Sequence, residues 1–302
     1  MPRPCVSRRP LHDSQAAAGR LGALACQLAV SLAAALAITA CSSPPARPPS
    51  PTQAAASASR ESGARALQRG DWPQASAHYQ AALQAAVALQ DPALTAAALQ
   101  GLSLASARQG DLPAALAHVE RILAAPQHFD AASQARAAAR KALLLLDAGN
   151  PDQALRWADR AGALCASPCT LAPVLDNLRA HLALARGDRA QAAALAQAAA
   201  RTAQASGQDG EWASALRLQA RALGPLGDTA GAAVALGQAL QIDRRLGQPD
   251  RVALDLLLAA ELEDQRGNRA LATDLLQRAL AVYAAIGDTA QAEPLRRRLA
   301  AR

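Results

Sequence analysis

Small apolar residues recur along this chain at fixed distances from a polar turn. The turn is a Gly followed by Asp or Asn, and its separations are 40, 39, 38, 40 and 40 residues for Gly70, Gly110, Gly149, Gly187, Gly227 and Gly267. Ala stands five residues after each glycine, and Gly, Ser or Ala stands seven residues before it. Because small side chains let two helices cross closely, the pattern predicts six helix pairs.

The chemistry of the turn explains how one helix ends and the next begins. Gly70 can adopt the left-handed conformation that ends a helix. Asp71 can accept a hydrogen bond from an amide of the following first turn. Pro73 lies where a missing N–H costs nothing, and Gln74 can complete a capping box. The same set returns at 149–153. Connections this short predict antiparallel neighbours.

A second series of glycines marks the connection between one pair and the next. Gly207, Gly247 and Gly287 each lie twenty residues after a turn glycine. The last of them opens the terminal stretch "GDTAQAEPLRRRLAAR", which would form a polar capping helix of the kind that stacked repeats need. The sequence therefore predicts thirteen helices in one solenoid.

Composition favours the same fold class. Apolar residues make up 51% of the chain and aromatic residues only 2%. Val, Ile and Thr are scarce, so there is little material for strands. Ala, Leu, Gln and Arg, all strong helix formers, dominate. We expect an all-α protein.

The repeated unit resembles the tetratricopeptide repeat (TPR), a helix–turn–helix unit with small residues on both sides of its turn. The resemblance covers about residues 56–302 and implies a right-handed superhelical solenoid of about six TPR-like helix pairs plus a C-terminal capping helix. The period departs from the usual 34 residues. Most large aromatic positions are filled by Ala or Leu, although Trp72 and Tyr79 keep some aromatic character.

The first forty residues have the pattern of an export signal. The uncharged apolar run Leu21–Ile38 follows a lead that contains Arg3, Arg8, Arg9 and Arg20. The run ends in "ITAC", which resembles the lipobox of bacterial lipoproteins. The resemblance implies cleavage after Ala40 and lipidation of Cys41. An uncleaved anchor helix, for which the run is of marginal length, a plain cleaved signal and a twin-arginine signal at 7–12 remain alternatives.

The residues after the lipobox suggest a location and a tether. Ser42 stands where Asp would resemble an inner-membrane retention signal, so the resemblance implies an outer-membrane lipoprotein that faces the periplasm. The Pro-rich segment that follows favours an extended spacer. We therefore divide the chain into a lipoprotein signal peptide (1–40), a lipidated Cys with a Pro-rich tether (41–59) and a helical repeat domain (56–302).

The sequence shows no constellation for catalysis. Four histidines of the expected mature chain, His78, His118, His128 and His181, are isolated from one another, and none has the spacing of a zinc-protease helix. Phosphate-binding and dinucleotide-binding glycine loops are missing from the sequence. The formal charge of +7 is spread along the chain without a recognisable nucleic-acid-binding module. We predict no enzyme activity, no catalytic residue, no metal, no cofactor, no nucleic-acid partner and no small-molecule substrate.

Two cysteines stand close together in "GALCASPCTLAP". Cys165 and Cys169 would form a disulfide in an oxidising compartment. A redox or metal-binding pair is the alternative, but three intervening residues do not match the two of thiol oxidoreductase motifs. We expect a structural clip.

The remaining candidate site is a surface. In tetratricopeptide solenoids the first helix of each pair lines the concave face, where partners bind. Counting back from each turn selects the candidate partner-binding residues Arg60, Gln100, Arg136, Asn177, His181, Arg217, Arg221, Glu261 and Asp264. Arg217 and Arg221 on one face could hold a carboxylate or a phosphate. The alternative is that these residues are solvated and have no partner.

The function that these patterns favour is a membrane-anchored, periplasm-facing scaffold that binds proteins or peptides, in envelope, pilus or secretion assembly. A TPR ligand or peptide sensor, a regulatory subunit and an accessory subunit of a cell-wall enzyme are the alternatives. The residues do not select one pathway.

Overall fold

Helices make up almost all of the described chain. The structure is a computed structural model that describes residues 50–302. The predicted signal peptide, its cleavage at Ala40, the lipidation of Cys41 and the first part of the tether lie outside the described residues and stay predictions. Within the described part, no helix is both long and apolar enough to span a bilayer.

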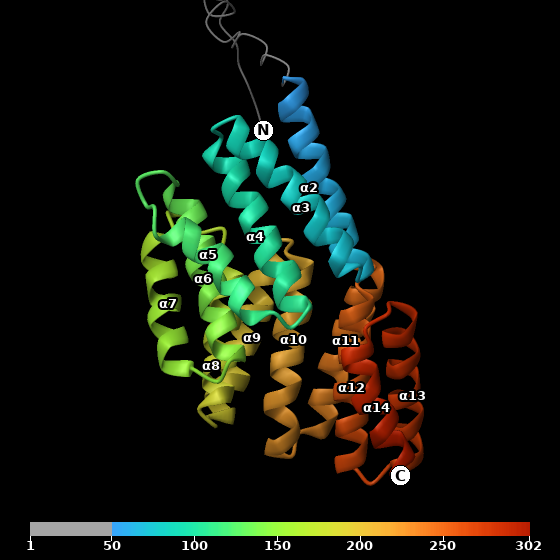
Figure 1. The fold of residues 1–302 in the computed structure, drawn as a ribbon. Helices are drawn as coiled ribbons and strands as arrows, with labels where there is room; N and C mark the ends of the chain where they lie inside the picture. Colours follow the sequence, from blue (N-terminus) through green and yellow to red (C-terminus); the bar gives the residue numbers. More distant parts are fainter. Residues whose placement is uncertain (1–49) are drawn as a thin grey trace, which may run out of the picture. The chain divides into compact units, whose positions relative to one another are not determined.

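The helices follow one another as six pairs and a cap (Figure 1). The pairs are α2 (Pro51–Arg69) with α3 (Trp72–Ala88), α4 (Pro92–Arg108) with α5 (Leu112–Leu123), α6 (Ala131–Asp147) with α7 (Pro151–Leu164), α8 (Ala172–Ala185) with α9 (Arg189–Ala205), α10 (Asp209–Leu223) with α11 (Thr229–Leu246), and α12 (Pro249–Gln265) with α13 (Arg269–Ala285). The cap is α14 (Thr289–Ala300), and a short 3-10 turn, Gly224–Leu226, precedes α11. Each helix packs on the next one along the chain. The predicted all-α solenoid is confirmed.

The glycines of both predicted series adopt the left-handed conformation. All nine have positive φ, from 64° at Gly247 to 91° at Gly227. Between the first two pairs the corresponding position is Gln90, which has φ of 50° and is the non-glycine residue with positive φ in the described chain. A residue with a Cβ is therefore held in a conformation that favours glycine.

Helix starts confirm the predicted caps at most turns. The Asp71 carboxylate accepts a hydrogen bond from the Gln74 amide at 3.1 Å. Equivalent bonds form at four further turns, those of Asp111, Asp188, Asp228 and Asp288. Asn150 differs from the prediction because its side chain makes no cap bond to α7. Its Nδ2 instead donates to the Ala148 carbonyl at 3.3 Å.

The small residues on both sides of each turn lie where paired helices cross. All twelve positions are buried: Ala75, Ala115, Ala154, Ala192, Ala232 and Ala272 after the turns, and Gly63, Ser103, Ala142, Ala180, Ala220 and Ala260 before them. The crossing of α4 and α5 is so close that the Ser103 hydroxyl donates to the Ala115 carbonyl at 2.8 Å. Larger side chains at these positions would force the helices apart.

Tyr79 fills the space between α2 and α4. A Cβ on Gly101 would stand 2.2 Å from the Tyr79 ring, and one on Gly63 would stand 2.9 Å from it. The ring is 6% exposed. The two glycines therefore leave room for the one large aromatic side chain at this crossing.

The first helix begins earlier than the sequence predicts. α2 starts at Pro51, and the Ser50 hydroxyl accepts a hydrogen bond from the Gln53 amide at 3.2 Å. Residues 51–59 are therefore helical, which differs from the extended conformation expected of the tether, although the predicted helical repeat domain also includes residues 56–59. Proline is tolerated in a first helical turn, and the following Ala-rich stretch places Ala56 in a buried position.

The two ends of the helical array come together. A Cβ on Gly70, at the end of α2, would lie 3.2 Å from Cβ of Ile286, at the end of α13. Arg108 of α4 pairs with Asp250 of α12 at 3.1 Å. In Figure 1 the end of α2 accordingly lies beside the orange and red helices of the C-terminal pairs. The concave surface therefore lies on the inner side of an array whose ends are in contact.

Candidate functional site: a cavity lined by the first helices

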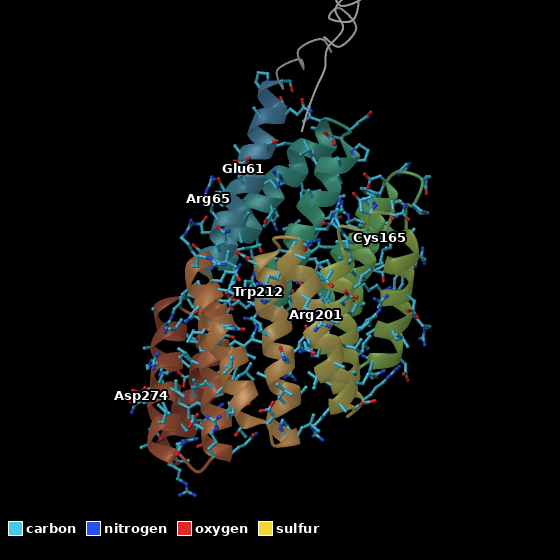
Figure 2. The ribbon with its side chains drawn as sticks, turned by 180° about the vertical axis from the view of Figure 1, so that it is seen from behind. Glu61, Arg65, Cys165, Arg201, Trp212 and Asp274 are labelled. Carbon is cyan, nitrogen blue, oxygen red and sulfur yellow. A yellow bond between two sulfur atoms is a disulfide. The ribbon has the colours of Figure 1, made fainter. Side chains whose placement is uncertain are left out.

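A cavity of about 1000 Å³ lies on the inner side of the array. Its lining comes from the first helix of every pair, with Trp72 and Tyr79 of α3 in addition. The second helices carry much of the exposed charge, as Asp274 on α13 and Arg201 on α9 illustrate (Figure 2). The fold thus separates an inner face, where side chains from all six pairs line one cavity, from an outer face in contact with solvent.

One register position lines the cavity in every repeat. The residue six before each turn glycine is a lining residue in all six pairs: Ala64, Leu104, Leu143, His181, Arg221 and Glu261. Further lining residues lie two, nine, thirteen and sixteen before a glycine, as Arg108, Arg140, Val174 and Arg251 do. These intervals of three, four and seven keep side chains on one helical face.

The predicted concave residues divide into two groups. Asn177, His181, Arg217, Arg221 and Glu261 line the cavity. Arg60, Gln100, Arg136 and Asp264 are not among its lining residues. Gln100 donates to the Ser133 carbonyl at 3.3 Å, and Arg136 is exposed. Arg302 and Arg298 hold Asp264, and the hydrogen bond from Arg302 is the main cause of its lowered pKa.

Arg217 already has partners within the protein. Its guanidinium bonds to Asp243 of α11 and, at 3.2 Å, to Asp255 of α12, and all three side chains are buried. Burial raises the pKa of Asp255 to about 7; Arg217 opposes the shift and the charge of Asp243 adds to it. The group links α10, α11 and α12. Its two carboxylates compensate the charge of Arg217, which the sequence suggested could hold a carboxylate or a phosphate of a partner.

Arg108 and Arg251 share one carboxylate where the two ends of the array meet. An Asp250 carboxylate oxygen lies 3.1 Å from a guanidinium nitrogen of Arg108 and 3.7 Å from Nε of Arg251. The Arg108 guanidinium also stands 5.8 Å from the centre of the Trp72 ring. Burial, followed by the neighbouring charge of Arg108, lowers the pKa of Arg251 to about 10. Two cations therefore compete for a single anion.

Two polar atoms in the cavity lining are buried without a hydrogen-bond partner in the described chain. One is Nε of Arg140, whose pKa is lowered to about 10 by burial and then by Arg108, against the opposing charge of Asp147. The other is Oδ1 of Asn177, whose Nδ2 donates to the Glu211 carbonyl and carboxylate at 2.9 and 2.8 Å. Buried polar atoms normally have partners, so this region of the lining is incompletely satisfied.

His181 lies between charges of both signs. Burial lowers its pKa, the Arg221 cation lowers it further, and Asp147 opposes both effects. A neutral imidazole can accept and donate hydrogen bonds. Among residues 50–302 no group of three or more His, Cys, Asp and Glu side chains is placed to hold a metal ion.

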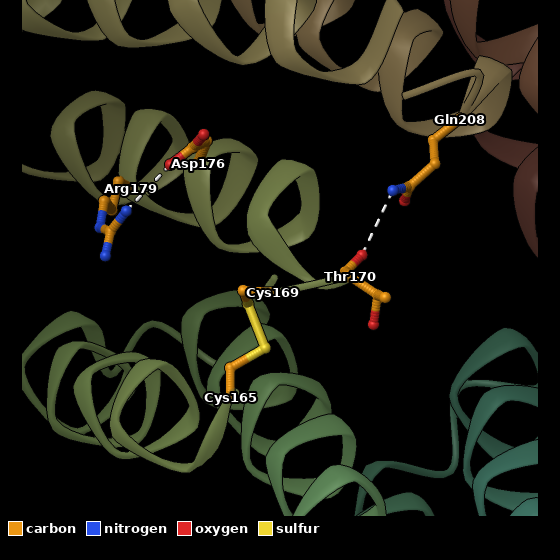
Figure 3. The surroundings of a disulfide bond; sticks show 6 residues. All are labelled: Cys165, Cys169, Thr170, Asp176, Arg179 and Gln208. Atoms are coloured by element: carbon orange, nitrogen blue, oxygen red, sulfur yellow. Dashed lines mark hydrogen bonds and ion pairs between the residues drawn. A yellow bond between two sulfur atoms is a disulfide. The ribbon is translucent and has the colours of Figure 1, made fainter. Parts of the chain in front are cut away.

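The cysteine pair lies in the loop between α7 and α8 (Figure 3). A disulfide joins Cys165 and Cys169, with their Cα atoms 5.4 Å apart. Nε2 of Gln208 donates to the Thr170 carbonyl at 3.2 Å and links this loop to the start of α10. Neither cysteine lines the cavity. The loop leads into α8, which carries Asn177 and His181.

Sequence reasoning missed the three cationic residues Arg108, Arg140 and Arg251. They lie two, nine and sixteen residues before their turn glycines, and these positions differ by seven, two helical turns. The predicted face was selected by counting ten and six residues back from each turn glycine, and ten is one residue away from nine. A search for charges at intervals of seven would have found all three residues.

The comparisons with known proteins find similarity at the level of fold. No family model and no curated protein matches the chain. Among solved structures, a Rap protein complexed with competence and sporulation factor aligns with a TM-score of 0.58 and 13% identity, over 82% of this chain and 70% of that one. The Cut9 protein of the APC/C hetero-tetramer Cut9–Hcn1 aligns with a TM-score of 0.52 and 18% identity, over 82% and 46%. BtubC from P. vanneervenii aligns with a TM-score of 0.50 and 17% identity, over 79% and 93%.

Rap and Cut9 are TPR proteins. At these identities the similarity concerns the arrangement of helices. The chain therefore has a TPR-type fold, and its binding chemistry has to be argued from its own cavity.

Proposed function

We propose that the protein is a lipid-anchored, periplasm-facing scaffold that binds a segment of another protein in its cavity, in envelope, pilus or secretion assembly. The observation that carries the binding proposal is the cavity of about 1000 Å³ that the first helices of all six pairs line. The lipobox-like "ITAC" before Cys41 supports the anchor.

The similar structures support binding of this kind. The Rap protein was solved with competence and sporulation factor, and Cut9 was solved with Hcn1. Both are thus TPR-type proteins in complex with a partner. The cavity lining combines leucines with many charged and polar side chains, which can fix the orientation of a bound segment.

A photo-crosslinking experiment in intact cells tests the proposal. A photoreactive amino acid would replace Leu104 in the cavity, and the control would carry it at Val234, which is 62% exposed on α11. We expect a partner protein to be captured from position 104 and identified by mass spectrometry. Capture from position 234 alone would contradict binding in the cavity.

The same cells test the anchor. Palmitate labelling should be lost in Cys41→Ser and retained in Cys26→Ser, because the lipobox-like pattern ends at Cys41. Labelling that persists in Cys41→Ser would contradict the lipoprotein assignment and leave the binding proposal in place.

A sensor for a peptide is the second candidate, and the meeting of the array's ends favours it. Gly70 approaches Ile286 and Arg108 pairs with Asp250, so a short ligand could be enclosed. Capture of a free peptide from position 104, without a folded partner, would favour the sensor. Capture of a folded partner would favour the scaffold.

A further inference from the structure

We propose that Arg108, Arg140 and Arg251 form a subsite that binds the carboxylate of an acidic side chain in a peptide ligand. The inference rests on the proposed binding function, because it names the chemistry of the segment that the cavity accepts. It goes further in assigning three residues of α4, α6 and α12 to one group on the ligand.

The cavity lining contains more cationic than anionic groups free to meet a ligand. Five arginines line it: Arg217 is already held by Asp243 and Asp255, Arg108 and Arg251 share Asp250, and Arg140 and Arg221 make no ion pair within the described chain. The four lining carboxylates are Asp147, Asp250, Glu211 and Glu261. Glu211 bonds to Asn177 and Glu261 lies 3.8 Å from Arg298 outside the cavity lining, so among the described residues Asp147 is the unpaired lining carboxylate, against the two unpaired arginines Arg140 and Arg221. An anion would relieve this imbalance.

Arg140 is the residue that most needs a partner. It makes no hydrogen bond and no ion pair within the described chain, and its Nε is buried. A guanidinium has five donors in a fixed plane, and a carboxylate can accept two of them side by side. Since a buried donor without a partner costs free energy, a ligand carboxylate at this position would regain what the unliganded protein loses.

A second unsatisfied atom indicates that the ligand also brings a donor. Oδ1 of Asn177 lines the same cavity, is buried and can only accept. A peptide supplies backbone N–H groups together with an acidic side chain, whereas a simple anion supplies acceptors alone. Leu104, Leu143 and Leu218 add apolar surface to the lining. An extended peptide with acidic and apolar side chains matches all three features.

The subsite joins the two ends of the array. Arg108 belongs to the second pair, Arg140 to the third and Arg251 to the sixth. Arg108 shares Asp250 with Arg251, and Arg140 lines the same cavity, where the charge of Arg108 lowers its pKa. A carboxylate placed among them would reduce the repulsion between cations and hold α4 and α12 together.

Selection on random peptides tests the proposal. The full chain, purified in detergent, would be incubated with an array of random-sequence hexapeptides, and bound sequences would be scored for Asp and Glu. We expect acidic residues to be enriched. The tightest peptide would then be titrated beside its version with Gln in place of Glu, and we expect the Gln version to bind about ten- to a hundredfold more weakly, the effect of one charge-assisted hydrogen-bonded contact.

Matched variants assign the effect to the subsite. Arg140→Gln should lose the preference for the acidic peptide, with an affinity about ten- to a hundredfold lower. Arg201→Gln removes the same charge from the exposed surface of α9 (Figure 2) and should bind as the wild type does. Inorganic phosphate, at equal ionic strength with chloride, should not displace the peptide beyond the effect of salt.

The melting temperature of the unliganded variants gives a second measure. Because Arg140 has no partner to lose, Arg140→Gln should melt at or above the wild-type temperature. Arg217→Gln should melt lower, since it leaves Asp243 and Asp255 buried without their cation. A lower melting temperature for Arg140→Gln would show a structural role and overturn the assignment.

The outcomes separate the subsite from the proposed function. Peptides that bind without acidic enrichment, or with equal affinity to Arg140→Gln, would overturn the subsite and leave peptide binding intact. Displacement by phosphate alone would overturn the choice of a peptide carboxylate. Failure of the wild type to retain any peptide would overturn both this inference and peptide binding in the cavity.

Discussion

At the scale of single residues, the backbone conformation is the most predictable part of this protein. Gly70 and Gly207 represent two series whose left-handed conformation follows from sequence spacing alone. Gly101 could not be interpreted in this way. Its constraint is the ring of Tyr79 from another helix, and such a contact is not visible in local sequence. Asn150 shows the converse, because its sequence position indicates a cap that the side chain does not form.

Asn150→Asp should stabilise the protein. A carboxylate cannot donate to Ala148, but it can accept from the amides of the first turn of α7 and interact favourably with the helix dipole. We expect a gain of about 0.5–1 kcal/mol in the free energy of unfolding, measured by urea denaturation at neutral pH.

Asn268→Asp is the matched control, with the opposite expected sign. Nδ2 of Asn268 donates to Glu263 at 2.6 Å, so the substitution would place two carboxylates side by side and lower stability. Equal shifts in the two variants would contradict the role assigned to local hydrogen bonding.

At the scale of helices, the order and number of elements can be predicted from the sequence. Which side chains of each helix line the cavity can be predicted only in part. Repeated turns and small crossing residues fix where each helix ends and what it packs against. The cavity stripe depends on the rotation of each helix, so a count of ten selected Arg60 and Gln100 but missed Arg140, at nine before its glycine. The buried group around Arg217 was also unpredictable, because Asp243 and Asp255 come from two other helices.

Asp255 should make stability depend on pH. Its pKa rises from an ordinary 3.8 to about 7 in the folded protein, so the folded state retains a proton that the unfolded chain has lost. The stabilisation from this proton is complete below about pH 3.8 and is lost as pH rises through about 7. The free energy of unfolding of the wild type, minus that of Asp255→Asn, should therefore fall between pH 4 and pH 7.

Taking this difference removes the contribution of titrating groups that do not interact with Asp255. The lowered pKa values of His118 and His181 act in the opposite direction, because their stabilisation is lost as pH falls. Both histidines are present in the wild type and in the variant, so their contributions to the free energy of unfolding cancel in the difference. Parallel stability curves for the wild type and Asp255→Asn would show that Asp255 does not carry the dependence.

At the scale of the whole repeat domain, the meeting of first and last pairs is the feature that the sequence does not predict. Periodicity gives the number of pairs, but the angle between successive pairs decides whether the ends of the array approach each other. Small differences in packing accumulate over six pairs. The accumulated angles between successive pairs bring Gly70 close to Ile286 and Arg108 close to Asp250.

Asp250→Asn should loosen the contact between the two ends. Without that carboxylate, Arg108 and Arg251 would face each other with no shared anion. Spin labels at Arg69 and Ala285, both exposed beside the contact, should report a longer and broader distance distribution than in the otherwise wild-type chain.

Asp274→Asn is the control for this measurement. It removes the same charge from an exposed pair with Arg278 on α13 (Figure 2) and should leave the distance distribution unchanged. An unchanged distribution in Asp250→Asn would mean that packing around Gly70 and Ile286 holds the ends together without the ion pair.

The approach of Gly70 to Ile286 also places a limit on repeat number. In an open array, each added or deleted unit changes length and stability by a nearly constant increment. Here the loss of one internal pair would move the two ends of the array out of contact. Arg108 would then no longer reach Asp250. Copy number in this protein is thus set by closure, and gene duplication or deletion of a single unit would change its geometry as a whole.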